Sequence, residues 1–118
     1  MAVDPYHLAY WQRAMAAQQT AREQAKVQAW HEAKAIATML RQRFGATRVI
    51  VFGSLLGDRF APQSDLDLAA ADIPRDRYFD AVAQANGLSQ RWVDLKPLED
   101  LDPYFKQRLI ERGIEIDA

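Results

Sequence analysis

Three aspartates stand in apolar stretches of this sequence, where an unpaired charge is costly. Asp65 and Asp67 are separated by one residue in "SDLDLAA", and Asp94 stands within "WVDLKPL". Residues i and i+2 of a strand project to the same side, so the first two carboxylates can share one divalent cation or two. Such a cation would relieve their mutual repulsion, and all-oxygen ligands favour Mg²⁺ or Mn²⁺ over zinc.

A glycine–serine pair precedes the aspartates. Gly53 and Ser54 follow the apolar run "TRVIVF", which predicts that they end a strand and open a helical turn. Backbone N–H groups in such a turn can bind phosphate oxygens, Gly53 permits close approach, and the Ser54 hydroxyl can donate a hydrogen bond. With three carboxylates nearby, this pattern fits metal-assisted attack on a phosphate, in which a carboxylate accepts the proton of the nucleophile.

The elements that must position these residues can be predicted from apolar spacing and from proline and glycine. One uninterrupted helix is expected over residues 5–44, with Asp4 as its cap, Pro5 in its first turn and Gly45 after its end. Strands are predicted over 47–54, 64–70 and 90–98, and helices over 74–87 and 99–113, the last beginning near Asp102. This order predicts an α/β (α+β) fold, with a short mixed β-sheet flanked by helices and a long N-terminal helix.

The first helix is long for a domain of this size. A helix over residues 6–44 would span roughly 58 Å, whereas a compact domain of this length has a radius of gyration of about 13–14 Å. Part of the helix must therefore project or fold back. Its N-terminal half carries a short apolar stripe of Leu8, Trp11 and Met15. We expect this stripe to meet another surface, either the domain's own core or another chain, including a second copy in a homo-oligomer.

Composition narrows the class of protein. The chain has 118 residues, of which 49% are hydrophobic and 26% charged, the balance of one ordinary globular domain. Its net charge is −1. The chain therefore has no excess of positive charge to attract nucleic acid, and we do not expect direct nucleic-acid binding. No apolar run is long enough to cross a membrane, no signal segment is apparent, and there is no cysteine. These features lead us to expect a cytoplasmic protein without disulfides.

The motif as a whole resembles that of a known family. Gly53-Ser54, ten further residues and then Asp65-Leu66-Asp67 resemble the G-S-x10-D-x-D signature of the minimal nucleotidyltransferases in the DNA polymerase β-like superfamily. Asp94 in "VDL" stands where that family has its third carboxylate. The resemblance runs from about Ala33 to the C-terminus. It divides the chain into an N-terminal helical extension, residues 1–30, and a minimal nucleotidyltransferase domain, residues 31–118.

The resemblance implies an enzyme that uses Mg²⁺ (or Mn²⁺) and a nucleoside triphosphate, expected to be ATP, to transfer a nucleoside monophosphate. By that resemblance Asp65 and Asp67 would bind the metal, and Asp94 would complete the metal and catalytic site and activate the acceptor. The residues that would hold the nucleotide are Gly53, Ser54 and Ser64, the last by bracing the turn into the second strand.

The turn after the glycine–serine pair departs from the family pattern. The family usually has a small residue, a basic residue and then a glycine, where this chain has Leu56, Gly57 and Asp58. An acidic side chain near a triphosphate is unfavourable unless it faces away. Arg59, or Arg48 from the preceding strand, is a candidate for the missing positive charge.

Many small members of this family resemble antitoxins that are paired with an all-helical HEPN ribonuclease toxin. By that resemblance the chain would add AMP to a tyrosine of such a toxin and silence it. The alternative is a binding module that keeps the fold and neutralises its partner by docking, with little catalysis. The three aspartates favour the enzyme, whereas the altered turn and the apolar stripe favour the module. Transfer to a small molecule such as an aminoglycoside ranks lower, because those enzymes usually carry more substrate-binding structure.

Overall fold

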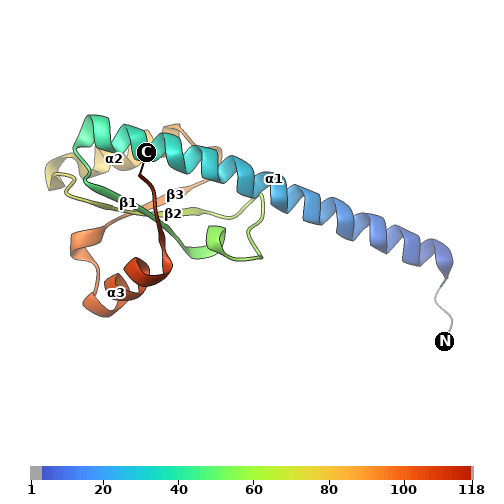
Figure 1. The fold of residues 1–118 in the computed structure, drawn as a ribbon. Helices are drawn as coiled ribbons and strands as arrows, with labels where there is room; N and C mark the ends of the chain where they lie inside the picture. The colour runs from blue at the N-terminus through green and yellow to red at the C-terminus, as the bar shows by residue number, and fades with distance from the viewer. Residues whose placement is uncertain (1–3, 118) are drawn as a thin grey trace.

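A single uninterrupted helix, α1 (Pro5–Phe44), opens the fold, as the sequence predicted. The structure is a computed structural model, which describes residues 4–117 (Figure 1). The Asp4 side chain caps α1 by accepting a hydrogen bond from the backbone N–H of Tyr6 at 2.9 Å. Gly45 ends the helix in the left-handed conformation, with φ of 74°, and its N–H bonds to the Leu40 carbonyl. Both ends of α1 are therefore fixed by local sequence signals.

A four-stranded mixed sheet follows α1. Its strands are β1 (Arg48–Phe52), β2 (Leu66–Ala71), β3 (Val93–Pro97) and β4 (Ile114–Glu115), in the spatial order β3-β2-β1-β4. β1 is antiparallel to both β2 and β4, whereas β2 and β3 are parallel. The two-residue β4 was not predicted, because so short a strand has no apolar alternation to reveal it.

Two further helices, α2 (Tyr78–Gly87) and α3 (Pro103–Arg112), complete the regular structure. The sequence predicted one helix over 74–87, but its first residues form a tight 3-10 turn, η2 (Arg75–Arg77), closed by the Arg77 N–H on the Pro74 carbonyl. Another turn, η3 (Leu98–Asp100), occupies the start of the range predicted for the last helix. α3 itself begins after Asp102, as expected, because the Asp102 carboxylate accepts a hydrogen bond from the Phe105 N–H at 3.1 Å.

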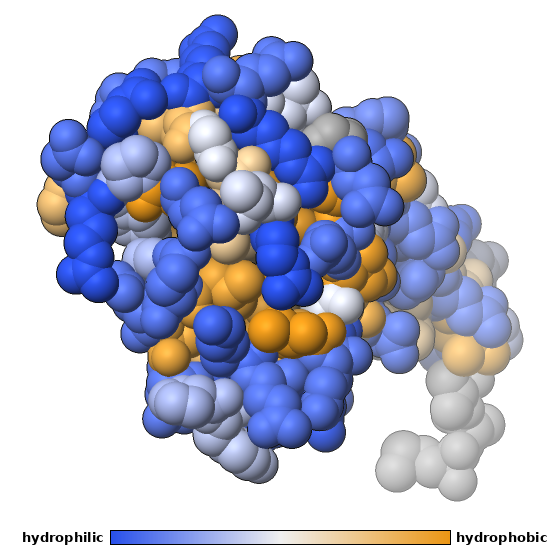
Figure 2. All heavy atoms as spheres, turned by 60° about the vertical axis from the view of Figure 1, so that its left-hand side comes forward, coloured by the Kyte–Doolittle hydropathy of each residue, from blue (hydrophilic) through white to orange (hydrophobic). Residues whose placement is uncertain are grey.

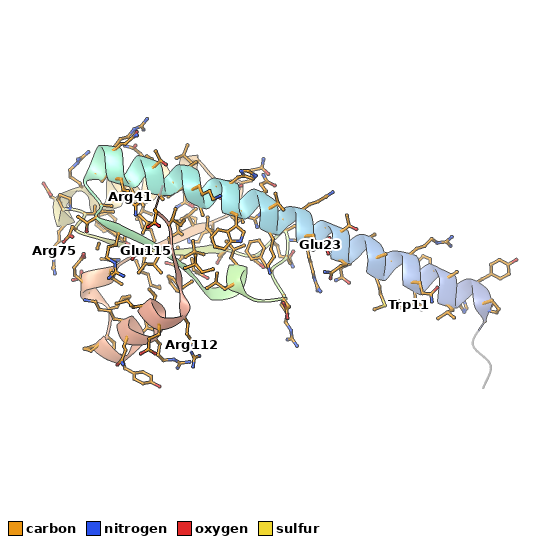
Figure 3. All side chains as sticks on the ribbon, viewed as in Figure 1. Trp11, Glu23, Arg41, Arg75, Arg112 and Glu115 are labelled. Carbon is orange, nitrogen blue, oxygen red and sulfur yellow. The ribbon has the colours of Figure 1, made fainter. Side chains whose placement is uncertain are left out.

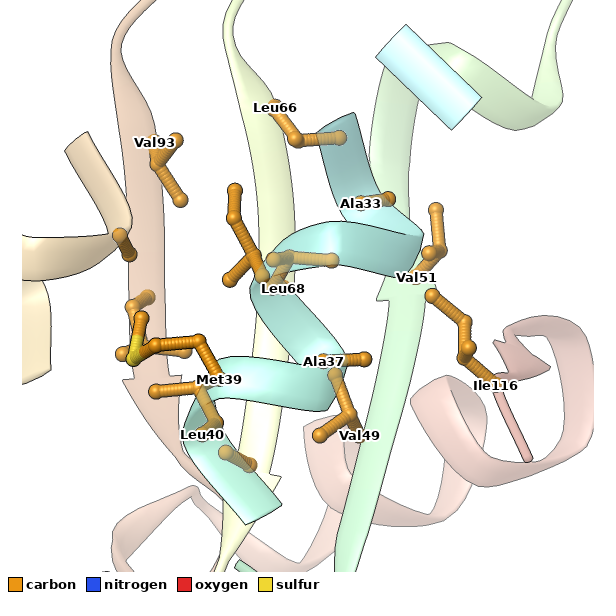
Figure 4. Close-up of a cluster of buried hydrophobic side chains, with 14 of the residues drawn as sticks. Ala33, Ala37, Met39, Leu40, Val49, Val51, Leu66, Leu68, Val93 and Ile116 are labelled. Carbon is orange, nitrogen blue, oxygen red and sulfur yellow. The ribbon is translucent and has the colours of Figure 1, made fainter. Parts of the chain in front are cut away.

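The two faces of the sheet are covered differently. The C-terminal half of α1 packs on one face, where side chains such as Leu40 from the helix and Leu66 and Leu68 from β2 are fully buried (Figure 4). The opposite face carries a smaller cluster in which Ile50 of β1 and Leu109 of α3 meet. Figure 2, in which the left-hand side of Figure 1 comes forward, shows hydrophobic surface between hydrophilic side chains. On α3 itself, Phe105 and Ile110 are 40% and 41% exposed, so part of its apolar surface is uncovered.

The N-terminal half of α1 projects beyond the sheet (Figures 1 and 3). Along α1 the buried positions begin at Ala25, whereas Trp11 and Met15 are 63% and 66% exposed. At 3.6 residues per turn, Leu8, Trp11 and Met15 lie on the same face of the helix as the buried Leu40. Of the two surfaces expected for this stripe, the domain's own core does not reach it. Although α1 has 40 residues, neither it nor any other helix within residues 4–117 is apolar enough over its length to cross a membrane.

The projecting arrangement predicts a contrast between two apolar residues on one helical face. Leu40→Ala should lower the free energy of unfolding by about 2–5 kcal/mol, because Leu40 is fully buried. The matched change Trp11→Ala should alter it by less than about 0.5 kcal/mol. Urea unfolding followed by circular dichroism, at a concentration where the chain is monomeric, gives both values. A loss above about 1 kcal/mol for Trp11→Ala would show that the helix folds back on the domain.

Candidate functional site

The parallel pairing of β2 and β3 places Asp67 directly beside Asp94. Neighbouring strands lie about 4.8 Å apart, so the two carboxylates are held close together by the backbone. Their neighbours Leu66 and Val93 are fully buried under α1 and α2, and side chains alternate along a strand. Asp67 and Asp94 therefore project from the opposite face, on the side of α3, and both are half-buried.

Asp65 lies one residue before β2 and is exposed. The negative charge of Asp65 is one of the causes that raise the pKa of Asp67. The structure therefore places Asp65 near Asp67. Within residues 4–117, however, no three acidic or histidine side chains are arranged to hold one metal ion. The three aspartates thus form a loose group centred on Asp67.

The pKa of Asp67 is raised above its ordinary value of 3.8. The largest cause is burial, followed by the charges of Asp94 and Asp65, while Lys96 and a hydrogen bond from the Ser54 backbone N–H act in the opposite direction. Burial and like charges both disfavour an ionised carboxylate. Ionisation of Asp67 is therefore opposed both by burial and by two neighbouring negative charges.

The glycine–serine turn packs directly against Asp67. Gly53 has φ of 77°, and a Cβ at this position would overlap the Asp67 carboxylate. Gly53 begins a short 3-10 turn, η1 (Gly53–Leu56), which confirms that the pair ends a strand and opens a helical turn. The Ser54 N–H, expected from the sequence to face phosphate, instead bonds to Asp67. The turn and the aspartate are therefore one structural unit.

Ser64 braces the connection into β2, as predicted. Its hydroxyl accepts a hydrogen bond from the Ala61 N–H at 3.0 Å, and its carbonyl accepts one from Arg91 at 3.1 Å. Arg91 also donates to the Pro62 carbonyl and lies 3.8 Å from the buried Glu32 of α1. Sequence reasoning did not find this buried link between α1 and the loop, because its members are far apart in the chain. Contact of Ser64 with a nucleotide stays a prediction.

Two further residues near the carboxylates were also missed. Lys96 places its Nζ atom 3.2 Å from Asp94 Oδ2, and the only sequence signal was its i+2 spacing from Asp94 in "VDLKPL". Burial, together with the charges of Asp94 and Asp100, raises the pKa of Tyr78 to about 12. The Tyr78 phenol therefore keeps its proton at neutral pH and is available as a hydrogen-bonding group.

Of the two basic residues considered for the altered turn, Arg48 is engaged elsewhere. Its Nε lies 2.7 Å from Glu115 Oε1 of β4, and Arg48 is at the end of β1 away from Gly53. Arg59 is exposed in the loop after η1. The expectation that Arg48 serves the turn is therefore wrong, because the unpredicted strand β4 supplies its partner.

The carboxylates suit a Mg²⁺ ion in their donor chemistry. Proteins usually hold Mg²⁺ by one or two carboxylates together with water and substrate phosphates, and not by a complete protein cage. Asp67 and Asp94 are adjacent oxygen donors. Burial and then the charges of Asp94 and Asp65 raise the pKa of Asp67, and a cation would relieve the second of these causes. Lys96 already neutralises part of the charge on Asp94, so a cation would compete with its ammonium group.

Known proteins resemble this chain at the level of family and fold. The family model described as nucleotidyltransferase domain matches residues 33–116, which include all four strands and the three aspartates. A solved structure provisionally described as a minimal nucleotidyltransferase superposes with a TM-score of 0.62. It is 24% identical in sequence, and the match covers 71% of this chain and 88% of that one, which shows a shared fold. A search of curated proteins found no match.

Replacing Asp67 by asparagine should raise the free energy of unfolding at neutral pH in the absence of divalent cations. Because the folded chain raises the pKa of Asp67 above 3.8, the stability that its protonated form contributes is complete below the unfolded pKa and is lost as the pH rises through the folded pKa. The amide oxygen of asparagine can still accept the Ser54 hydrogen bond.

The difference in free energy of unfolding between Asp67→Asn and wild type should be largest at neutral pH and should vanish in acid. Urea unfolding in EDTA at a series of pH values measures it. Asp76→Asn, at an exposed aspartate of η2, is the control and should give no such pattern. A variant that is less stable than wild type at neutral pH would contradict the proposed repulsion.

Two glycines with positive φ allow a matched test of the contact between the turn and Asp67. Gly45→Ala should lower the free energy of unfolding by about 1–2 kcal/mol, the strain of a left-handed alanine, since nothing lies within 4 Å of the added methyl group. Gly53→Ala should cost about 2–4 kcal/mol, because steric overlap with Asp67 adds to the same strain. Equal losses in the two variants, measured by thermal unfolding, would show that the contact is absent.

Proposed function

The chain belongs to the nucleotidyltransferase domain family, and on that premise we propose that it transfers AMP from ATP to a hydroxyl group of a protein. The observation that carries this proposal is the pair Asp67 and Asp94, adjacent on two parallel strands and packed against the Gly53-Ser54 turn. A structural role alone gives no reason to gather like charges there at a cost in stability. A cation-bound phosphate gives such a reason.

In the proposed reaction the acceptor hydroxyl oxygen attacks the α-phosphorus of ATP. A new oxygen–phosphorus bond forms, the bond from the α-phosphorus to the bridging oxygen of the β-phosphate breaks, and pyrophosphate leaves with the bonding electrons. When bound, Mg²⁺ would supply positive charge against the phosphates and the leaving oxygen. One or two carboxylates of the group Asp65, Asp67 and Asp94 would hold it, and substrate phosphates and water would complete its ligands.

The chain's own groups have separate parts in this reaction. Asp94 is the group we assign to accept the proton of the acceptor hydroxyl, since it lies on the outer strand β3 and is partly exposed. Lys96 fixes the orientation of Asp94 from 3.2 Å. The Ser54 N–H fixes that of Asp67. Both carboxylates are thus held before a substrate arrives, which is what positioning catalysis requires.

The acceptor we propose is a tyrosine of a HEPN-type toxin, which would make the chain an antitoxin. The support is the resemblance of its G-S-x10-D-x-D motif to that of such antitoxins, together with the half-exposed position of Asp94, where the hydroxyl of another protein can reach it. The exposed stripe of Leu8, Trp11 and Met15 on α1 offers a second surface for the same partner.

A docking module without transfer is the second candidate. The ion pair between Lys96 and Asp94 is the observation that favours it, because the Lys96 ammonium group competes with a metal ion for that carboxylate. Asp58 adds a negative charge to the altered turn, at a position where the family usually has a glycine.

Calorimetry with ATP tests the nucleotide binding that the proposed transfer reaction requires. We expect ATP to bind in the presence of Mg²⁺ and at least about 10-fold more weakly in EDTA, because the carboxylates then repel the phosphates. The double variant Asp65→Asn/Asp67→Asn should lose the Mg²⁺-dependent part, and Asp76→Asn should retain it. If ATP binds equally well with and without Mg²⁺, or if the double variant binds it as wild type does, the carboxylates take no part in nucleotide binding.

Transfer itself is read with ATP labelled in the α- or the γ-phosphate, incubated with the chain and a HEPN-type toxin. Label from the α-phosphate alone should appear on the toxin, and Asp94→Asn should reduce its rate at least about 100-fold. If the toxin is neutralised without label, and the Asp65→Asn/Asp67→Asn variant still neutralises it, the docking module is the correct function.

A further inference from the structure

A groove runs between η1 and α3 on the side of the sheet from which Asp67 projects. It has a volume of about 530 Å³, within the usual range for small-molecule sites. Its apolar floor is formed by Phe52 and Leu56 on one side and by Phe105 and Leu109 of α3 on the other. The rings of Phe52 and Phe105 meet edge to face at 5.9 Å between centroids. The floor is thus a packed surface joining α3 to the turn.

Two arginines give this groove its charge. Among the described residues that line it, Arg108 and Arg112 are the only charged ones. They are one helical turn apart on α3, so they share a face of the helix, where like charges repel. Neither makes an ion pair within residues 4–117: Arg108 stacks over Tyr104 at 5.6 Å, and Arg112, labelled in Figure 3, is exposed at the end of α3. The uncompensated pair is complementary to an anion.

The groove and the carboxylates have Gly53 in common. Gly53 lines the groove and also abuts the Asp67 side chain, so an anion that reaches from the arginines to this turn comes close to the proposed metal ligands. The apolar floor lowers the local dielectric, which strengthens attraction between guanidinium and phosphate. Arginine is suited to the task because its planar group can bind two phosphate oxygens at once.

We propose that Arg108 and Arg112 bind the β- and γ-phosphates of the nucleoside triphosphate, the part that leaves as pyrophosphate. This assignment rests on the proposed function and adds a subsite to it. It also accounts for the altered turn at Leu56, Gly57 and Asp58: positive charge that the family usually places in the turn comes here from α3, across the groove.

The subsite is tested by calorimetry with Mg²⁺ and two probes, ATP and inorganic pyrophosphate. In Arg108→Gln/Arg112→Gln the affinity for each probe should fall about 10- to 100-fold, whereas the affinity for AMP should stay unchanged. The control Arg13→Gln/Arg22→Gln removes the same charge from α1, away from the groove, and should bind all three ligands as wild type does. Arg108→Lys/Arg112→Lys keeps the charge but not the two-oxygen geometry, and should fall between wild type and the glutamine variant.

The outcomes separate this inference from the function on which it rests. Wild-type affinities for ATP and pyrophosphate in the folded glutamine variant, with binding still lost in Asp65→Asn/Asp67→Asn, would overturn the subsite and leave the proposed function standing. Equal losses of affinity in the glutamine and control variants would show that net charge causes the effect. That result would also overturn the subsite. If pyrophosphate binds through the arginines while ATP gains nothing from Mg²⁺, the subsite stands and the transfer reaction does not. Failure of wild type to bind either probe would overturn both.

Discussion

The site depends on the parallel pairing of β2 with β3, which holds Asp67 beside Asp94. The backbone fixes this neighbourhood, so the two side chains cannot separate to escape their repulsion. Burial of Asp67 adds to the cost and raises its pKa. The surrounding contacts reduce that cost without removing it: the Ser54 N–H bonds to Asp67, and Lys96 lies against Asp94. The fold thus stores unfavourable electrostatic energy that a bound cation can release.

A glycine and two arginines complete the surroundings of the carboxylates. At Gly53 only a residue without a side chain leaves room for the carboxylate, which brings the turn and β2 into one unit. Across the groove, Arg108 and Arg112 hold positive charge without ion-pair partners in the described part of the chain. Gly53, which lines the groove and touches Asp67, therefore links the negative charge on β2 and β3 with the positive charge on α3. Such a separation suits a ligand that carries phosphates and a cation together.

Sequence reasoning found what is encoded locally. The caps of α1 and the spacing from Gly53 to Asp67 could be predicted because each depends on residues close together in the chain. The mixed sheet could be predicted from the order of helices and strands. The two-residue β4 and the engagement of Arg48 by Glu115 could not, since they depend on pairing between distant segments. The same holds for the groove, which exists only once α3 packs beside η1. Lys96 was visible at i+2 from Asp94, but only the fold shows that they pair.

A titration of the Asp67 carboxyl carbon by NMR tests the central claim most directly, because it observes the strained group itself. In EDTA the pKa of Asp67 should lie above 3.8, and addition of Mg²⁺ should lower it as the cation relieves the repulsion from Asp94 and Asp65. A pKa at or below 3.8 in EDTA would show that the carboxylates do not strain one another. A raised pKa that Mg²⁺ leaves unchanged would show that the strain does not serve a metal site.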